Sequence, residues 1–566
     1  MDRTHRHGWR ARFRRPAIAL LAVGTSVSFG LVATGGSATA GVSSSGPKLA
    51  TSGPADEGPY PWKYPASGSE SVGSGTTVGG LKCTPGTPQF NSPYAPPCIA
   101  KFTGNNGGAT YRGVTSNEIV LAQREFPATA NSEEVEAEAK EAGAAPQQVT
   151  DQVQAVFLKY FNKVFDLYGR HVVIEPMTAT GNATTEALGQ GQAQACADAD
   201  TIANQMHAFG EDGLLDNFQA GGTGPFSQCA ANDKLVEFNG DAYFDEGTFQ
   251  SQNPYVWSTT QDCTRISSSE AEVVGTMLAG KKAIYAGDPT LQNETRKFAT
   301  YVPNVKQYQT CTANFENTLT SKYHVAKSAL APDFYYNLDI STFQQSAQQA
   351  IVQFKAAGVT TVILASDPFS VGFLTTAAAA QNYHPEWFTI GTAFTDEDQA
   401  AQAYYDPAEV TGHLFGMSEL SVSTDTTGPT SLAGKLYQKL TGHPIPAETD
   451  GTYSQLIAIF DALQAAGPDL TPGNLARGLH ALPTLGAPDF QYGSWTWNIG
   501  TAGNPGGGDH TASNSARFIY WDGGAISPIN QQKGTYVPIF GGQRFTLGEW
   551  PKALPKLFTA PGSAAT

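Results

Sequence analysis

Residues 359–396 carry the pattern that most restricts how this chain can fold. The segment 359–364 is a short run of apolar and β-branched residues that predicts a buried strand, and a turn at residues 365–368 follows it. Helix-period segments lie on both sides, and residues 387–391 predict a second strand. Such alternation predicts a βαβ unit in a parallel sheet covered by helices. Ligands of these sheets bind beyond the carboxyl ends of the strands, so the turns at Asp367 and at 392–394 are the first functional candidates.

The N-terminal 40 residues have the layout of a signal peptide. An arginine-rich stretch precedes an apolar run at 17–33, and Ala38-Thr39-Ala40 suits cleavage after Ala40. Small residues within and after the run disfavour a retained anchor, and the export route stays open. No cysteine follows before Cys83, so a lipid anchor on a new N-terminal cysteine is not expected. We therefore expect a secreted, extracytoplasmic protein of the cell envelope, without membrane insertion after cleavage.

Net charge limits the classes of partner. The leader carries six arginines and one aspartate, so its removal takes the formal charge from −16 to −21. An acidic exported protein repels nucleic acid and anionic lipid, and neither is an expected partner. The remaining length is sufficient for two sizeable cores.

The six cysteines predict disulfide bonds. Their number is even, they all follow the leader, and no Cys-x-x-Cys pair occurs, which disfavours zinc or redox chemistry. Six cysteines allow fifteen connectivities. We favour pairing of nearest neighbours, namely Cys83 with Cys98, Cys196 with Cys229, and Cys263 with Cys311.

Composition separates an N-terminal segment from the body. Residues 41–112 are rich in Gly, Ser, Thr and Pro with few aliphatics, so we expect a low-complexity linker of which much is mobile and only 83–98 is held as a disulfide loop. The body begins with a turn and strand at 113–121, and an acidic solvated helix is expected at 133–141. Further strands are predicted at 171–174, 282–286, 493–498 and 516–521, and helices at 153–165, 193–209, 291–301, 343–354 and 453–463.

The order of these elements resembles type I periplasmic binding proteins, within them the leucine/isoleucine/valine-binding branch that serves ABC importers. The residues that carry the resemblance are Gly113-Val114-Thr115, Tyr168-Gly169-Arg170, the glycine-rich loop at Gly221, Asn253-Pro254-Tyr255-Val256-Trp257, Lys281 to Tyr285, the unit from Phe343 to Gly391, and the helix at Tyr453. A bridge between Cys196 and Cys229 also fits some relatives.

The resemblance implies the fold class: α/β, two doubly wound parallel-sheet lobes joined by three hinge crossings, with ligand held between them. We expect the crossings near 258–260, near 392–395, and in the loop before Arg517. One lobe would comprise 113–259 and 396–513, the other 260–395 and 514–566.

The resemblance also implies the ligand-binding loops, each of which can equally be a plain turn. On the first lobe the expected residues are Gly222, Thr223, Gly224, Asp245 and Glu246. On the second lobe they are Asp288, Asp367, Phe369, Thr392 and Phe394.

One departure from the amino-acid-binding pattern concerns the ligand's ammonium group. Relatives place an acidic residue after the strand equivalent to 389–391, whereas this chain has Thr392-Ala393-Phe394. A desolvated ammonium without a counter-charge costs several kcal/mol, so an ordinary amino acid is not assigned. Nearby aromatic residues suit an apolar or ring-containing small organic ligand, although core packing explains most of them. They are Tyr243, Phe244, Trp257, Tyr285, Phe369 and Phe394.

Enzyme signatures are poor by comparison. The sequence lacks a Gly-x-Ser-x-Gly elbow, His-Glu-x-x-His, a P-loop and a complete dinucleotide fingerprint, so we expect no catalysis, cofactor or metal. The leading hypothesis is a solute-binding protein with an ABC transporter permease as partner. The alternatives are a sensory or scaffold ectodomain that binds a protein partner through its surface, and a hydrolase with dispersed carboxylates.

Overall fold

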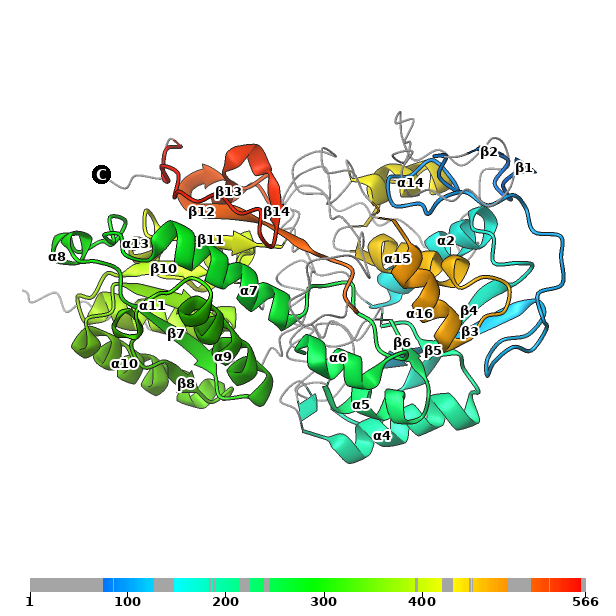
Figure 1. Cartoon of the computed structure of the whole chain (residues 1–566), viewed down its shortest axis with the longest axis horizontal. Coiled ribbons are helices and arrows are strands. Elements are labelled where there is room, and N and C mark those ends of the chain that lie inside the picture. The colour runs from blue at the N-terminus through cyan, green and yellow to red at the C-terminus, as the bar shows by residue number, and fades with distance from the viewer. Residues whose placement is uncertain are drawn as a thin grey trace, which may run out of the picture.

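The computed structural model describes residues 75–84, 86–126, 147–182, 185–186, 190–213, 224–238, 244–391, 395–419, 431–446, 449, 451–483, 485, 510–528 and 530–560. These residues form two α/β bodies that lie side by side (Figure 1). One is built on a four-stranded sheet and the other on an eight-stranded sheet. The predicted α/β class with parallel sheets is confirmed.

The first body has four parallel strands in the order β4-β3-β5-β6. These are β3 (Glu118–Glu125), β4 (His171–Thr178), β5 (Gly210–Glu211) and β6 (Val236–Glu237). The chain moves outward from β3 to β4 and then returns to place β5 on the other side of β3. This reversal creates a switch point at the carboxyl ends of β3 and β5, where ligands of doubly wound sheets bind.

Helices from two distant parts of the chain cover this sheet. From the first part come α2 (Gln147–Val164), α4 (Gln192–Asp200), η1 (Thr201–Gln205), α5 (Gly224–Asn232) and α6 (Glu246–Gln252), and from the second α14 (Leu432–Thr441), α15 (Gly451–Ala465) and α16 (Pro472–Ala481). Apolar residues of α2 at three- and four-residue spacing face the core. Phe157 and Phe161 there contact Tyr453 of α15, with ring centroids 5.6 and 5.5 Å apart.

The second body has strand order β13-β12-β11-β10-β9-β7-β8, and β14 pairs with β12. Strands β7 (Phe298–Pro303), β8 (Phe334–Tyr336), β9 (Thr361–Leu364), β10 (Glu386–Thr389) and β11 (Leu414–Ser418) are parallel. Strands β12 (Ser515–Ile526), β13 (Lys533–Pro538) and β14 (Arg544–Thr546) extend the sheet with antiparallel pairs. Here β8 and β9 flank β7, so the switch point lies at the carboxyl ends of β7 and β9.

Helices lie on both faces of the second sheet. They are α7 (Cys263–Val273), η2 (Val274–Leu278), α8 (Pro289–Asn293), α9 (Lys306–Ser321), η3 (Lys327–Ala329), α10 (Ile340–Ala357), α11 (Pro368–Ala380), α12 (Asp398–Tyr404), α13 (Pro407–Val410) and η5 (Phe540–Gly542). The predicted βαβ unit is confirmed as β9, α11 and β10. Two separate apolar clusters, one on each face, bury the sheet.

Two chain segments run beside each other between the bodies. The Ser258 amide donates to the carbonyl of His510 at 2.9 Å, and the Ala512 amide donates to the carbonyl of Ser258 at 2.8 Å. Figure 1 shows the second segment continuing into β12 of the other body. The remaining passage lies between residues 419 and 431 and includes positions outside the described ranges.

The predicted strand at 282–286 and helix at 291–301 are wrong. Residues 284–285 form a turn with Ile284 54% exposed, and the strand is β7, whose residues are all buried. Residues 298–303 combine aromatic, β-branched and apolar side chains that suit a buried strand better than a helix. The first strand of the second sheet is thus β7, formed by residues that were predicted to end a helix, and not the segment 282–286.

The boundary expected at residue 396 also differs from the structure. Strand β11 pairs with β10 and β12 of the second sheet, and Tyr405 and Val410 belong to the core of the second body. Residues 396–419 therefore pack with the second body, because β11 is added to its sheet as a fifth parallel strand before the chain returns to the first body at α14. The division into hinged lobes stays a prediction.

The segment before the body is folded where it is described. Strands β1 (Gly75–Thr76) and β2 (Lys82–Cys83) pair, and Phe90 is fully buried against Phe165, the residue directly after α2, with ring centroids 5.0 Å apart. Arg170 donates to the carbonyls of Asn106 and Gly108. The expectation of a largely mobile linker is therefore wrong for residues 75–112, since buried aromatic contacts offset the ordering entropy.

All three predicted disulfides are present. They join Cys83 to Cys98, Cys196 to Cys229, and Cys263 to Cys311, and they suit an oxidising compartment. The leader at 1–40, the acidic helix at 133–141 and the strand at 493–498 lie outside the described residues. Within the described ranges, no helix has both the length and the apolarity to cross a membrane.

Candidate functional site

The carboxyl edges of the two sheets meet at a pair of helix N-termini. Gly224 begins α5 after β5, and Gln307 lies in the first turn of α9 after β7. A β-carbon at Gly224 would lie 3.3 Å from Nε2 of Gln307 and 3.2 Å from Cε1 of Phe244. The absence of a side chain at Gly224 therefore permits close approach of the two bodies, next to both switch points.

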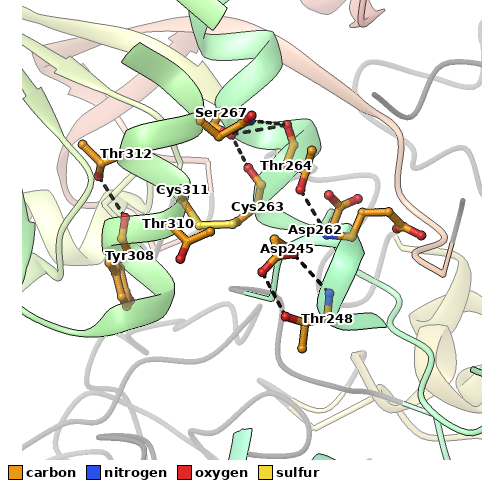
Figure 2. The surroundings of a disulfide bond; sticks show 12 residues. Asp245, Thr248, Asp262, Cys263, Thr264, Ser267, Tyr308, Thr310, Cys311 and Thr312 are labelled. Atoms are coloured by element: carbon orange, nitrogen blue, oxygen red, sulfur yellow. Dashed lines mark hydrogen bonds between the residues drawn. A yellow bond between two sulfur atoms is a disulfide. The ribbon is translucent and has the colours of Figure 1, made fainter. Parts of the chain in front are cut away.

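A disulfide holds the second-body side of this contact. Cys263 opens α7 and is bonded to Cys311 of α9. The Cys263 amide donates to the Phe244 carbonyl at 3.0 Å. Figure 2 shows Asp245 and Thr248 of α6 beside Asp262, at the N-terminal end of α7. The start of α6 in the first body thus abuts the start of α7 in the second.

The predicted residues Asp245 and Glu246 both serve local contacts here. Asp245 caps α6 by accepting from the Thr248 amide at 3.1 Å. Glu246 is fully buried and lies 2.7 Å from Nδ1 of His510 in the returning segment. The His510 ring packs on Trp257, with centroids 5.0 Å apart. Glu246 therefore connects α6 to the returning segment.

Polar contacts fasten the returning segment to α7. Asp262 caps α7 through the Arg265 amide, and the Thr511 hydroxyl donates to its other oxygen at 3.2 Å. The Arg265 guanidinium donates to the Ser513 carbonyl. Burial raises the pKa of Asp262, and the adjacent Arg265 opposes that rise. This region is a joint whose geometry depends on a few buried hydrogen bonds.

Asp367 and Phe369 follow β9 at the second switch point, as predicted. Asp367 is buried, caps α11 through the Ser370 amide at 2.9 Å and accepts from the Tyr336 hydroxyl at 2.6 Å. Burial raises its pKa, and the Tyr336 hydrogen bond opposes the rise. The ring of Phe369 lies 4.5 Å from that of Tyr404, a side chain that is 41% exposed. Asp367 therefore shapes this edge as a helix cap.

Asp288 lies at the opposite edge of the same sheet. The Gly287 amide donates to the carbonyl of His384, two residues before β10, and the Tyr285 amide donates to Glu386, the first residue of β10. These contacts place residues 285–288 at the amino ends of the strands. Asp288 is thus separated from the other predicted residues. It was expected at the carboxyl edge because residues 282–286 were predicted to form a strand that ends just before it. Gly222, Thr223, Thr392 and Phe394 lie outside the described residues.

Sequence reasoning missed Glu211 at the first switch point. It ends β5, is fully buried, and neither carboxylate oxygen has a partner by hydrogen-bond geometry in the described part of the chain. Burial, reinforced by Asp212, raises its pKa to about 8, while nearby backbone amides of Gly213 and Arg124 oppose the rise. The signal was present: an acidic pair between a short strand and a glycine-rich loop.

A second missed group lies beyond β11. Glu419 accepts from the Gln261 amide at 3.3 Å, and its carbonyl accepts from Arg544 at 2.7 Å. Burial raises the pKa of Glu419 to about 8. Gln261 directly follows the first crossing at 258–260, so its hydrogen bond with Glu419 connects that crossing to the carboxyl end of β11.

The facing edges carry buried hydrogen-bonding groups suited to hold a polar part of a small molecule. In the described ranges, no group of three His, Cys, Asp or Glu side chains could hold a metal ion.

No protein-family model and no curated protein matches the chain. Solved structures similar to it include three substrate-binding proteins of transporters. One is a fatty acid ABC transporter protein from Thermomonospora curvata, with 13% identity and TM-score 0.47, covering 78% of this chain and 96% of that one. Another is a solute binding protein from Rhodopseudomonas palustris in complex with 3,4-dihydroxybenzoic acid, with 12% identity, TM-score 0.45 and coverage of 76% and 98%.

The third is the branched-chain amino acid transporter substrate binding protein LivJ from Streptococcus pneumoniae in complex with isoleucine. Its identity is 11%, its TM-score 0.45, and the coverage is 75% of this chain and 100% of that one.

Proposed function

We propose that the chain is a non-catalytic extracytoplasmic solute-binding protein that captures a small organic molecule between its two bodies and presents it to an ABC importer. The observation that supports this most is the meeting of two switch points: Gly224 of the first body lies directly against Gln307 of the second. Binding across such a joint favours the closed arrangement, since ligand contacts both sides only there.

The division into hinged lobes belongs to this proposal. The first lobe comprises the β3–β6 sheet with α14–α16, and the second comprises the β7–β14 sheet, including residues 396–419. The two adjacent segments at Ser258 and Thr511 act as hinge strands.

The test is a panel of carboxylic acids, their amides, amines and neutral solutes, measured by thermal melting and tryptophan emission. We expect at least one compound to raise the melting temperature and alter the emission of Trp257, which is buried beside the joint. X-ray scattering should show a more compact particle with that compound bound.

A pair of glycine variants locates the site. Gly224→Trp should weaken binding strongly because its ring would collide with Phe244 and Gln307. Gly473→Trp on α16 is the matched control, since a β-carbon there meets nothing within 4 Å. Equal affinities of the two variants would place the site elsewhere. A panel without any hit, combined with capture of an envelope protein partner, would favour the sensory or scaffold ectodomain.

A further inference from the structure

Arg124, Arg296 and Arg517 are among the largest side chains with less than 2% exposure. Two of them have complete ion pairs. The Arg124 guanidinium lies 2.6 Å from carboxylate oxygens of both Glu186 and Asp198. Arg296 donates to the two carboxylate oxygens of Glu386, from Nε at 2.7 Å and from Nη2 at 2.8 Å. In these two arginines, carboxylates thus compensate the charge of the buried guanidinium.

Arg517 is the exception. It lies in β12 opposite Ser418 of β11 and Arg544 of β14, at the edge where the parallel strands end. Its side chain is fully buried, and none of its three guanidinium nitrogens has a hydrogen-bond partner in the described part of the chain. Arg517 shares a strand face with Ile519 and Trp521, under α12.

Burial lowers the pKa of Arg517, and Asp396 and Asp398 oppose that change, so Asp396 is a candidate partner that does not complete the pair. It follows β10, is fully buried, and forms no ion pair within 4.0 Å of Arg517 in the described ranges. Neither of its oxygens has a partner by hydrogen-bond geometry, although the Ser418 hydroxyl is close enough to affect its titration. The Arg517 guanidinium is thus left without a hydrogen-bond partner in the described ranges, beside a buried carboxyl group.

An unpaired buried charge of this kind is strongly unfavourable. Of the external groups that could satisfy a guanidinium, a carboxylate matches its planar fork best. We propose that Arg517 receives the carboxylate of a small organic acid and that Asp396, in its protonated form, donates a second hydrogen bond to the same group. This inference rests on the proposed solute-binding function and names the class of solute.

The position supports a role in that site. Arg544, the cross-strand neighbour of Arg517, donates to the Glu419 carbonyl, and Glu419 accepts from Gln261 at the first crossing. The anion site would therefore lie three contacts away from the first crossing: Arg517 to Arg544, Arg544 to Glu419, and Glu419 to Gln261. Binding of a ligand carboxylate to Arg517 would therefore make closure of the two bodies depend on the negative charge of the ligand.

The test compares acids with their amides on the same protein. Benzoate and octanoate are titrated against benzamide and octanamide, with inorganic phosphate as a competing anion. We expect the acid of at least one pair to bind and its amide to bind about 30-fold more weakly or worse. Arg517→Met should weaken binding of the acid by a similar factor, whereas Arg477→Met on the exposed face of α16 should not.

Folding of the variant is checked separately. Because Arg517 lacks partners, Arg517→Met should melt at or above the wild-type temperature, so loss of binding will not reflect unfolding. Because burial raises the pKa of Asp396 to about 7, the acid should also bind more weakly as pH rises through that value, and Asp396→Asn should bind with little pH dependence. The charged or titratable groups that interact with Asp396 are Arg517, Arg544, Glu397, Glu419, Tyr405 and Tyr536, and Asp398 interacts with Arg517.

The outcomes separate the two proposals. If the wild type binds a neutral solute, or binds an acid that Arg517→Met binds equally well, the anion site is refuted and the solute-binding function stands. Phosphate binding without carboxylate binding refutes the organic acid. If no compound of the full panel binds, both proposals fail.

Discussion

The two edges of the eight-stranded sheet handle buried charge in opposite ways. At the amino edge, Glu386 accepts from Arg296, from the Thr361 hydroxyl and from the Tyr285 amide, so both charges are satisfied. At the carboxyl edge, Arg517 is equally buried, and none of its guanidinium nitrogens has a hydrogen-bond partner in the described ranges. The comparison indicates that the amino edge is built for stability, whereas the carboxyl edge retains unsatisfied groups, as functional sites commonly do.

The largest expected effect comes from exchanging each arginine for methionine. Arg296→Met leaves the Glu386 carboxylate buried without its counter-charge and should lower the free energy of unfolding by about 3–5 kcal/mol. Arg517→Met removes an unpaired charge and should lower it little or not at all. Denaturant unfolding of the two variants checks this difference.

Glu386→Gln provides the matched control for the amino edge. It leaves Arg296 buried without a carboxylate, so it should destabilise the protein about as much as Arg296→Met. If Arg517→Met proves as destabilising as either variant, the contrast between the two edges is wrong.

The next effect concerns the disulfide at the carboxyl edge. Cys263 and Cys311 are 48 residues apart, so their double replacement by serine should cost about 2–4 kcal/mol of stability. Because the bond joins α7 to α9 beside Gly224, affinity for the ligand should fall as well. Replacement of Cys83 and Cys98, which lie on the first body, should lower stability and leave affinity unchanged; parallel loss of affinity there would argue against a local role.

The sequence patterns predicted the parts of this fold that local physics determines. A short apolar run located β9, a turn leading into a strand located β3, and three- and four-residue spacing located α2 and α15. Short chain separation favoured the three disulfides that the structure contains. Phe90 escaped notice because its burial depends on α2, some 70 residues later in the chain, and no local period reveals such a contact.

The site was harder to predict because one strand was misplaced. Residues 282–286 look like a strand, yet they pack across the amino edge, and their displacement moved Asp288 to the wrong end of the sheet. Arg517 was missed for another reason: a strand arginine is ordinary in sequence, and only the tertiary structure shows that it is buried without a partner.

Stability should also depend on pH through the carboxyl edge. Burial raises the pKa of Asp396 from 3.8 to about 7, so the folded state binds its proton more tightly than the unfolded state. Its contribution is complete below pH 3.8 and is lost as pH rises towards and through 7, by at most about 1.4 kcal/mol per pH unit. Asp396→Asn should flatten the unfolding free energy over that window; a variant with the wild-type slope would assign the titration to other buried acids such as Glu419.

The smallest expected effects distinguish two helix caps, one at each edge. Asp288 caps the short helix α8 through one amide and is only partly buried, so Asp288→Ala should cost about 0.5–1 kcal/mol. Asp367 caps α11 while buried and also accepts from Tyr336, so Asp367→Ala leaves that hydroxyl unsatisfied and should cost about 2 kcal/mol or more. Thermal unfolding of both variants measures the difference. Affinity for the ligand should change only for Asp367→Ala, because only that cap shapes the carboxyl edge; a change for Asp288→Ala alone would place binding at the amino edge.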